Sequence, residues 1–390
     1  MDFLLNDEQR QIVAMVRELA KTKIAPNAAR WDVEEKFPEE LVEIFAEAGL
    51  FGLPVPEEYG GLGADALTRV LVVEELSKVD ASAALLLAVH DLGLTPIVVG
   101  ASEEQKQRWL PNFATGKWLA AFALTEPGAG SDPGGMVMRA RREGDEYVLN
   151  GSKIFISNGS IAHGVTVFAR TDPNSKGPRG ISAFLVEKGT PGFTAVPMKG
   201  KLGLHASDTA QLFFEECRVP VSNRLGEEGE GFQIAMKTLD RSRANIAAQA
   251  LGVAEGAFEY ALNYVQERQQ FGQQVASFQG VQFMLADMAT AIEAARGLTY
   301  QAAIRIEREG KGGARLVTAN RYSAMAKMFA TDVAMRVTTD AVQLLGGYGV
   351  IRDYPVERMM RDAKIFQIYE GTNQIQRIVI ARSYLGGTRG

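Results

Sequence analysis

The sequence predicts a mostly α-helical protein with a central β domain. Apolar side chains recur every three to four positions in residues 1–117 and again in 228–390, which is the spacing of one buried helix face. Residues 118–227 instead contain short β-rich runs divided by Gly and Pro. We therefore expect an N-terminal helical domain, a middle β domain and a C-terminal helical bundle with these boundaries.

The N-terminal region carries helix and loop signals. Asn6 can cap a helix, and Gln9, three positions later, completes the pattern of a capping box. Residues 66–79 and 81–99 continue the helical spacing. The Pro and Gly content of 55–64 predicts a loop.

The middle region is typical of a β domain. Asn150-Gly151 lies between two short β-rich runs, and this dipeptide favours the positive φ angles of a tight turn, so we predict a hairpin turn there. We expect further strands in GVTVFAR, GISAFLVEK, GFTAVPM and TAQLFFEECRVP. From about residue 228 onward, long helices broken at 270–279 and 345–349 predict a bundle.

Composition excludes several classes of protein. The net charge of −5 gives no support for nucleic acid or an anionic membrane as partner. The chain has one cysteine and three scattered histidines, so we expect no intramolecular disulfide and no metal site. We find no run of about 18 apolar residues and predict no membrane-spanning helix. A reducing, cytoplasmic compartment is expected.

Two segments of the β region could hold a ligand. In 123–132, ALTEPGAGSD, Gly128 and Gly130 would let the backbone approach a ligand, and exposed N–H groups in such a loop bind electron-rich groups. In KIFISNG, Phe155 and Ser157 alternate on a strand and point to one face, where a flat cofactor could lie. A turn-rich connection and an ordinary core Phe are the alternatives.

Polar residues of the C-terminal region also have two interpretations. Asp240 and Arg243 are neighbours on a helix face, which alone favours a surface ion pair. The segments 267–272, ERQQFG, and 343–349, QLLGGYG, are typical of helix ends. Glu370 lies among apolar residues, where burial would raise its pKa and suit it to act as a general base. Its alternative role is to stabilise a helix N-terminus.

Together these segments resemble the acyl-CoA dehydrogenase family. The segments TEPGAGSD, KIFISNG, ERQQFG, QLLGGYG, YPVERMMRDAKI and IYEGTNQIQR occur in that family's order, and the match covers almost the whole chain. The resemblance implies an N-terminal helical domain, a middle β-barrel and a C-terminal four-helix bundle. It also implies FAD as cofactor, an acyl-CoA substrate, a homotetramer and an electron-transferring flavoprotein as electron acceptor.

The resemblance assigns a set of residues to FAD. It places the flavin against the loop 122–131, with Phe155 over one ring face and Ser157 at the flavin edge. A neighbouring subunit would complete the adenine–diphosphate site. The implied FAD-binding residues are Phe122, Leu124, Thr125, Gly130, Ser131, Phe155, Ile156, Ser157, Arg268, Phe271, Gln279, Gln343, Leu344, Gly346, Gly347, Thr372 and Gln374.

The resemblance identifies Glu370 with the family's usual catalytic base. Some members carry the base at the position of Ser242, where serine cannot do that work. Glu370 would remove the α-proton of a thioester while the β-hydride passes to flavin N5, giving a trans-2-enoyl-CoA. The implied acyl-CoA contacts are Ser131, Asp240, Arg243 and Gly371.

The substrate and the electron acceptor have alternatives. The stretch LDRSRANIAAQALGVAEGA looks most like the short-chain, butyryl-type branch. Medium-chain, branched and cyclic acyl-CoAs stay open, because a hydrophobic pocket discriminates one methylene by only about 1–3 kcal/mol. An acyl-CoA oxidase that uses O₂ is a second alternative. A flavin monooxygenase on the same scaffold, whose members lack the Glu of the YEGT motif, and a non-catalytic helical scaffold are further ones.

Overall fold

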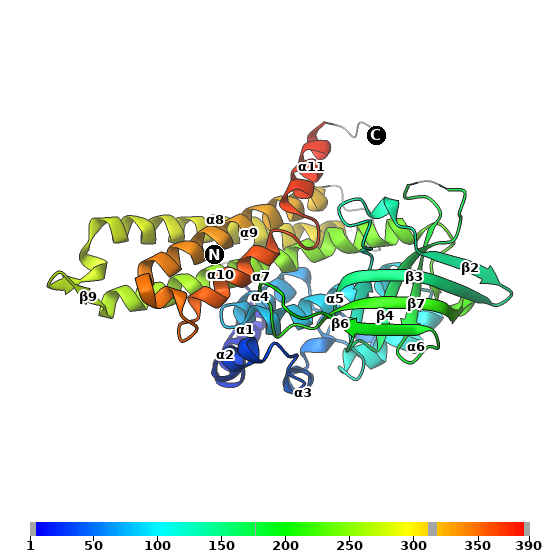
Figure 1. Ribbon diagram of the computed structural model, residues 1–390, viewed down its shortest axis with the longest axis horizontal. Coiled ribbons are helices and arrows are strands. Elements are labelled where there is room, and N and C mark those ends of the chain that lie inside the picture. Colours follow the sequence, from blue (N-terminus) through cyan, green and yellow to red (C-terminus); the bar gives the residue numbers. More distant parts are fainter. Residues whose placement is uncertain (1–4, 176, 311–317, 386–390) are drawn as a thin grey trace.

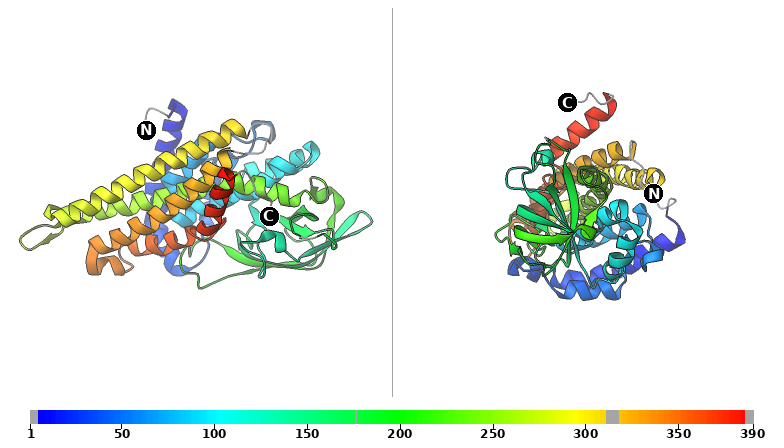
Figure 2. Two further views of the ribbon diagram at one scale, coloured as in Figure 1. Left: turned by 90° about the horizontal axis from the view of Figure 1, so that it is seen from above. Right: turned by 90° about the vertical axis from the view of Figure 1, so that its right-hand side faces the viewer.

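The computed structural model describes residues 5–175, 177–310 and 318–385. Long helices lie at one end of the molecule and a β-sheet at the other, with the N-terminal helices along their side (Figure 1). The order along the chain is helical, then β, then helical, which confirms the predicted architecture. Figure 2 shows the long helices running side by side and the curled sheet seen from its own end.

The N-terminal region contains helices whose starts are set by polar caps. The predicted capping box is confirmed: Gln9 donates its backbone N–H to Asn6 Oδ1 at 2.8 Å, and Asn6 donates its own to Gln9 Oε1 at 3.1 Å. The predicted helices of 66–79 and 81–99 are also present. The helices are α1 (Asp7–Leu19), α2 (Ala25–Glu34), α3 (Glu40–Glu47), α4 (Ala66–Ser77), α5 (Ala81–Gly100) and α6 (Glu103–Ala114), with a π-helical turn at Ala20–Ile24 and 3-10 turns at Leu50–Gly52 and Glu57–Tyr59.

Helix α5 is the central helix of this region. Among the described helices it alone is long and apolar enough to suit a membrane by length and composition, which the sequence search for uninterrupted apolar runs did not detect. However, 83% of its most apolar window is buried inside the protein, as in the core helix of a soluble fold. Gly93 lets α5 approach the sheet, since a Cβ there would lie 2.7 Å from Ala120 Cβ.

The middle region forms an eight-stranded sheet in the order β6-β7-β3-β2-β4-β5-β8, with β1 beside β4. Tyr147 on β3 and Phe184 on β5 have ring centroids 4.8 Å apart, although two strands separate them in that order. The sheet therefore curls around a shared apolar core, as a barrel does. The strands are β1 (Ala120–Ala123), β2 (Arg139–Glu143), β3 (Glu146–Ser157), β4 (Gly164–Arg170), β5 (Ile181–Glu187), β6 (Phe193–Pro197), β7 (Thr209–Pro220) and β8 (Arg224–Leu225), with 3-10 turns at Pro133–Gly135 and Val221–Asn223.

The hairpin turn predicted at Asn150-Gly151 is wrong. Both residues lie inside the continuous strand β3, and the turn falls at Gly144, whose φ is +60°. Asn150 sits instead at a bulge opposite β7, where its amide donates to Glu216 Oε1 at 2.8 Å and accepts from the Glu216 backbone N–H at 2.9 Å. The ladder therefore has one extra residue on β7 at this point, which is a bulge between paired strands and not a turn.

The C-terminal region is a bundle of long helices, as predicted. Helices α7 and α9 make its longest contact, and α8 and α10 pack against them. The predicted breaks are confirmed, since 270–279 holds a short hairpin and 345–349 a 3-10 turn. The elements are α7 (Gly231–Glu267), β9 (Gln269–Gln270), β10 (Gln273–Gln274), a 3-10 turn at Val275–Ser277, α8 (Gln279–Glu309), α9 (Thr318–Leu345), a 3-10 turn at Gly346–Val350, α10 (Val356–Phe366) and α11 (Asn373–Tyr384).

Candidate active site

Glu370 lies in a strained turn between α10 and α11. Its φ is +51° and that of Gly371 is +93°, so two consecutive residues adopt left-handed backbone angles. Thr372 then caps α11, its side chain accepting the Ile375 N–H at 3.3 Å. A non-glycine residue in this conformation costs about 1–3 kcal/mol and persists only where its surroundings fix it.

Buried side chains fix this turn from both sides. Lys327 on α9 donates to the Gly371 carbonyl at 2.8 Å, and Gln376 on α11 donates to the same oxygen at 2.9 Å. Gln376 also reaches the Glu370 carbonyl at 3.3 Å. The φ of Gly371 favours glycine, and a Cβ there would lie 2.6 Å from Gln376 Nε2, so a larger residue would displace the Gln376 amide.

The Glu370 carboxylate points to α7. Its Oε2 accepts a hydrogen bond from Ser242 Oγ at 2.5 Å. Burial raises the pKa of Glu370 to about 7, against the opposing effects of the Ser242 hydrogen bond and the Lys327 charge. This carboxylate is therefore engaged with α7, which argues against a role confined to stabilising the N-terminus of α11.

Asp240 and Arg243 lie inside α7, close to Ser242. Their ion pair spans 2.8 Å and both residues are buried, at 9% and 5% exposure, so the surface ion pair that the sequence alone favoured is wrong. Arg243 also donates to Asn320 Oδ1 at 3.0 Å. A buried, hydrogen-bonded pair fixes the guanidinium beside the base turn.

The glycine-rich loop after β1 is tied to β3. Ile154 donates its backbone N–H to the Thr125 carbonyl at 3.0 Å. Sequence reasoning missed a second tie: the buried Lys153 ammonium pairs with the buried Glu126 carboxylate at 2.8 Å. Glu126 also accepts the Val137 N–H at 2.6 Å. The sequence signal that could have revealed this ion pair is the position of Lys153 inside a β-rich run.

Phe155 is not a core residue. It is 64% exposed, has a φ of +59° and lies at a register shift of β3 against β7. The neighbouring Ile156 is buried, while Ser157 is half-buried, so Phe155 and Ser157 share the side away from the core. Of the other predicted residues here, Phe122 and Leu124 are buried, and Gly130 and Ser131 are exposed.

This part of the chain fits a flat cofactor. A Cβ added at Gly128 or Gly130 would meet no protein atom within 4 Å, and neither residue has a positive φ. The fold itself therefore does not require glycine there, whereas close approach of a ligand to the backbone would. The exposed ring of Phe155, fixed on the adjacent strand, is a surface for stacking.

A second group of predicted residues gathers at the tip of the bundle. A hollow of about 430 Å³ is lined by Arg268 and by residues of 343–347. The Arg268 guanidinium lies 5.6 Å from the ring centre of Tyr348, a residue that sequence reasoning missed. Phe271, on the β9–β10 hairpin, is 92% exposed. The predicted residues in the hollow are Arg268, Gln343, Leu344, Gly346 and Gly347; Gln279 begins α8 nearby.

The predicted residues therefore fall into separate groups. The β9 hairpin and the sheet lie at opposite ends of the molecule (Figure 1). The base turn contacts α7 through Ser242, and α7 is linked to the sheet through α5, since Asp91 on α5 accepts from Asn245 on α7 at 2.8 Å and Gly93 packs on Ala120. Thr372 caps α11 just after the base turn, and Gln374 lies in the first turn of that helix and is exposed.

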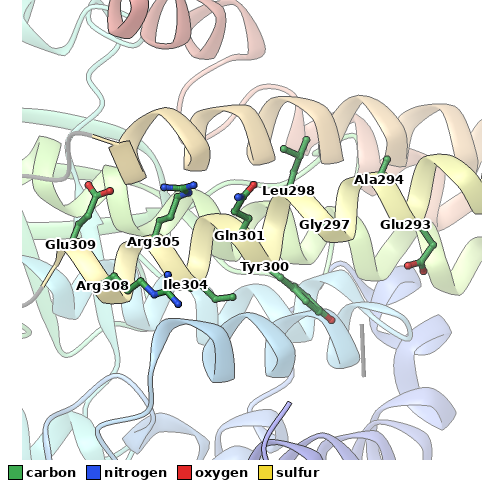
Figure 3. A pocket seen from close by; sticks show the side chains of 10 residues that line it. All are labelled: Glu293, Ala294, Gly297, Leu298, Tyr300, Gln301, Ile304, Arg305, Arg308 and Glu309. Atoms are coloured by element: carbon green, nitrogen blue, oxygen red, sulfur yellow. The ribbon is translucent and has the colours of Figure 1, made fainter. Parts of the chain in front are cut away.

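Another hollow, of about 850 Å³, runs along α8 from Glu293 to Glu309. In Figure 3 Leu298 and Tyr300 point to opposite sides of that helix. Tyr300 donates to the buried Glu74 carboxylate at 2.8 Å. None of the predicted site residues lines this hollow, so its size alone does not make it the site.

Comparison with known families decides what kind of site this is. Family models of the acyl-CoA dehydrogenase N-terminal, middle and C-terminal domains match residues 6–117, 121–217 and 229–385. The chain belongs to the acyl-CoA dehydrogenase family. It is an enzyme, and the alternative of a non-catalytic helical scaffold is excluded. Members of this family depend on FAD.

Curated relatives of this acyl-CoA dehydrogenase span the full chain. The short-chain specific acyl-CoA dehydrogenase of Clostridium acetobutylicum is 50% identical over 98% of this chain and 99% of its own length. The cyclohex-1-ene-1-carbonyl-CoA dehydrogenase of Geobacter metallireducens is 49% identical over the same shares. Because these two relatives are named for different acyl groups and are almost equally similar to this chain, sequence identity does not decide the size of the substrate.

Solved structures agree on the fold. Butyryl-CoA dehydrogenase of Megasphaera elsdenii has a TM-score of 0.94 at 45% identity, covering 99% of this chain and 100% of that one. A chain in the structure described as the electron transferring flavoprotein of Acidaminococcus fermentans has a TM-score of 0.94 at 51% identity, with the same coverage. A glutaryl-CoA dehydrogenase of Mycobacterium smegmatis in complex with FADH2 scores 0.90 at 33% identity, covering 100% of this chain and 97% of that one.

Proposed function

We propose that this enzyme converts a short-chain acyl-CoA thioester to the trans-2-enoyl-CoA, with Glu370 as the base that removes the α-proton. The observation that carries the proposal is the Glu370 carboxylate, whose pKa burial raises to about 7 and whose oxygen is held by Ser242 at 2.5 Å. A base is most effective when its pKa lies near the operating pH, because it is then both ionised and strong enough.

The turn would also position the base. The left-handed angles of Glu370 and Gly371 direct the carboxylate to α7, and Lys327 and Gln376 prevent the turn from relaxing. We propose that the backbone N–H of Glu370 donates to the thioester oxygen, where negative charge develops as the proton leaves. A preorganised donor of this kind is worth about 3–4 kcal/mol in the transition state.

We propose FAD as the cofactor, which when bound supplies the acceptor for the β-hydride. Loop 122–131 and Phe155 would hold the flavin, because the two open glycines and the exposed ring permit a flat group to lie there. Ser157, Thr372 and Gln374 are the proposed polar contacts. The substrate contacts that we propose are Ser131, Asp240, Arg243 and Gly371.

The residues at the tip of the bundle are proposed to serve a second copy of the chain. Arg268, Phe271 and Gln343 lie at the opposite end of the molecule from the sheet, so they suit the cofactor of a neighbouring subunit better than their own (Figure 1). A homotetramer, as the family resemblance implies, would bring the two ends together. Several exposed apolar side chains gather at this tip, namely Phe271, Tyr348 and Ile351, which supports the proposal because gathered apolar side chains mark interaction surfaces.

The short-chain substrate is supported by the short-chain relative and by the butyryl-CoA dehydrogenase structure. The cyclohex-1-ene-1-carbonyl-CoA relative favours a cyclic acyl-CoA as the second candidate. We propose an electron-transferring flavoprotein as electron acceptor and a cytoplasmic location. Burial raises the pKa of the Cys217 thiol to about 11, which keeps this cysteine protonated and unreactive.

Anaerobic absorbance of the flavin bands tests the proposal. The purified protein would be titrated with butyryl-, octanoyl-, palmitoyl-, isobutyryl-, isovaleryl- and cyclohexanecarbonyl-CoA. We expect bleaching, fastest with butyryl-CoA, and reoxidation by an electron-transferring flavoprotein faster than by O₂. The reverse order of reoxidation would identify an oxidase. A yellow protein that no acyl-CoA bleaches, or a colourless one that takes up no FAD, would overturn the proposal.

Glu370→Gln tests the base itself. The variant keeps the size of the side chain but cannot accept a proton, so bleaching should slow by about 10³-fold or more while FAD content is unchanged. Glu47→Gln, the same change at an exposed position on α3, is the matched control. Bleaching of Glu370→Gln at the control rate would exclude Glu370 as the base.

A further inference from the structure

Lys327 is a buried cation whose hydrogen bond helps to hold the base turn but whose charge no step described so far uses. It lies on α9 with 0% exposure, which is rare for a lysine unless the ammonium is paired. Its Nζ donates to the Gly371 carbonyl at 2.8 Å and to Asn373 Oδ1 at 3.0 Å. The ammonium therefore contacts the chain immediately after Glu370, on both sides of the cap of α11.

The acceptor on Asn373 is itself oriented. The Asn373 amide nitrogen donates to Thr331 Oγ1 at 2.8 Å and to Asp332 Oδ1 at 2.8 Å. These bonds fix which end of the amide carries the oxygen, and that oxygen faces Lys327. The contact is therefore built by two further residues of α9 and does not depend on a chance rotamer.

The charges around Lys327 come from each element packed against it. Burial lowers the pKa of Lys327 to about 7, the negative charges of Glu370 and Asp332 raise it, and Arg243 from α7 lowers it. In return, Lys327 and Arg243 lower the pKa of Glu370, whereas Asp91 on α5 raises it. Lys327 and Glu370 thus each favour the charged form of the other.

The outer charges of this group are already paired. Asp91 is 3.0 Å from Arg69, and Arg243 is 2.8 Å from Asp240. Asp332 lies 3.3 Å from Arg377 at the surface. Lys327 reaches the Glu370 turn through the Gly371 carbonyl, and its protonated ammonium places a positive charge close to a carboxylate that must be ionised to act.

We propose that Lys327 is a positioning residue for the catalytic base: its ammonium holds the Glu370–Gly371 turn and its charge keeps Glu370 ionised. This inference rests on the proposed role of Glu370. It predicts that neutralising Lys327 weakens catalysis most on the acidic side of the pH profile, where the ionised fraction of Glu370 depends most on its pKa. A merely structural lysine would affect every pH equally.

The test compares pH profiles of kcat/KM for three variants of Lys327. Lys327→Met removes both charge and hydrogen bonds, Lys327→Gln removes the charge but keeps a donor, and Lys327→Arg keeps both. We expect the Met and Gln variants to lose about tenfold more at about pH 6 than at about pH 9, because a shift of one pKa unit is tenfold in the ionised fraction. The Arg variant should recover the acidic limb. Lys364→Met, at an exposed position on α10, is the control.

A second measurement separates proton removal from the rest of turnover. Exchange of the α-hydrogen of butyryl-CoA in D₂O, followed by mass spectrometry, should show the same shift in the Met and Gln variants while FAD content stays at the wild-type level. An acidic limb at the wild-type position in every soluble variant would overturn the proposal, whatever the absolute rates. If Glu370→Gln were fully active, the proposed base would fail first, and the two failures are therefore distinguishable.

Discussion

The turn around Glu370 and the tip of the bundle are built in opposite ways. At the turn, Lys327 and Gln376 are fully buried and hold two strained residues by hydrogen bonds of 2.8 and 2.9 Å to one carbonyl. At the tip, Phe271 is 92% exposed, and the β9–β10 hairpin pairs only two residues on each strand. One region is completed by its own chain, whereas the other leaves its key side chains in solvent.

The difference follows from what each region must do. A base with a raised pKa needs fixed apolar and charged surroundings, which only residues of the same folded core can supply. The tip instead presents a cation and a ring, Arg268 and Phe271, at the surface, where the proposed homotetramer would place a second copy of the chain. Changes at the turn should therefore alter proton chemistry, and changes at the tip should alter cofactor retention and assembly.

Among changes that leave Glu370 itself in place, the largest effect is expected for Gly371→Ala. The added Cβ meets Gln376 Nε2 at 2.6 Å, and the φ of +93° disfavours any L residue, so the base should move. A displacement of about 1 Å can cost about 10²-fold, and we expect a loss of that size in kcat. Gly49→Ala is the control, because Gly49 also has a positive φ but open space around it. Equal activity of the two variants would show that the turn need not be rigid.

An intermediate effect is expected for Arg268→Ala. Loss of the guanidinium beside Tyr348 should weaken FAD retention about tenfold, as removal of a charged hydrogen bond does. The loss should grow on dilution, since the residue is proposed to serve a neighbouring subunit. Flavin absorbance after gel filtration at several concentrations measures it, with the exposed Arg336→Ala as control. Full FAD content of Arg268→Ala at every dilution would show that the tip of the bundle does not contribute to FAD binding.

The smallest effect is expected for Ser242→Ala. The Ser242 hydrogen bond lowers the pKa of Glu370, so its removal should raise that pKa further and move the acidic limb of kcat/KM to higher pH. We expect a loss of about 3–10-fold below neutral pH and little change above it. Ser77→Ala, at a buried helical serine that bonds only its own helix, controls for packing. A shift of the acidic limb to lower pH would contradict the claim that the Ser242 hydrogen bond lowers the pKa of Glu370.

Local patterns in the sequence predicted the elements of the fold, whereas the assignment of Glu370 as the base came from the family resemblance and stays a prediction. The Asn6–Gln9 box and the breaks at 270–279 and 345–349 depend on neighbours in the chain, and the structure confirms them. The Asn150 turn failed because its conformation is decided by Glu216 on another strand. A local sequence pattern carries no information about contacts between residues that are far apart in the chain.

The same reason explains the residues that were missed. Lys327 is 44 positions from Gly371, and Lys153 is 27 from Glu126. From the sequence alone, a lysine that becomes buried in the core cannot be distinguished from a lysine on the surface of a helix or strand. The burial of Asp240 and Arg243 was hidden in the same way, since their spacing of three is equally typical of an exposed helix face.

The pH dependence of kcat/KM for butyryl-CoA tests the central claim most directly. If Glu370 is the base in its buried turn, activity should rise with pH through a midpoint near 7, because only the carboxylate accepts the α-proton and burial raises its pKa to about 7. Glu370→Gln should show no such limb. A midpoint near the ordinary glutamate value of about 4.3 would mean that the base is solvated, and would contradict the account.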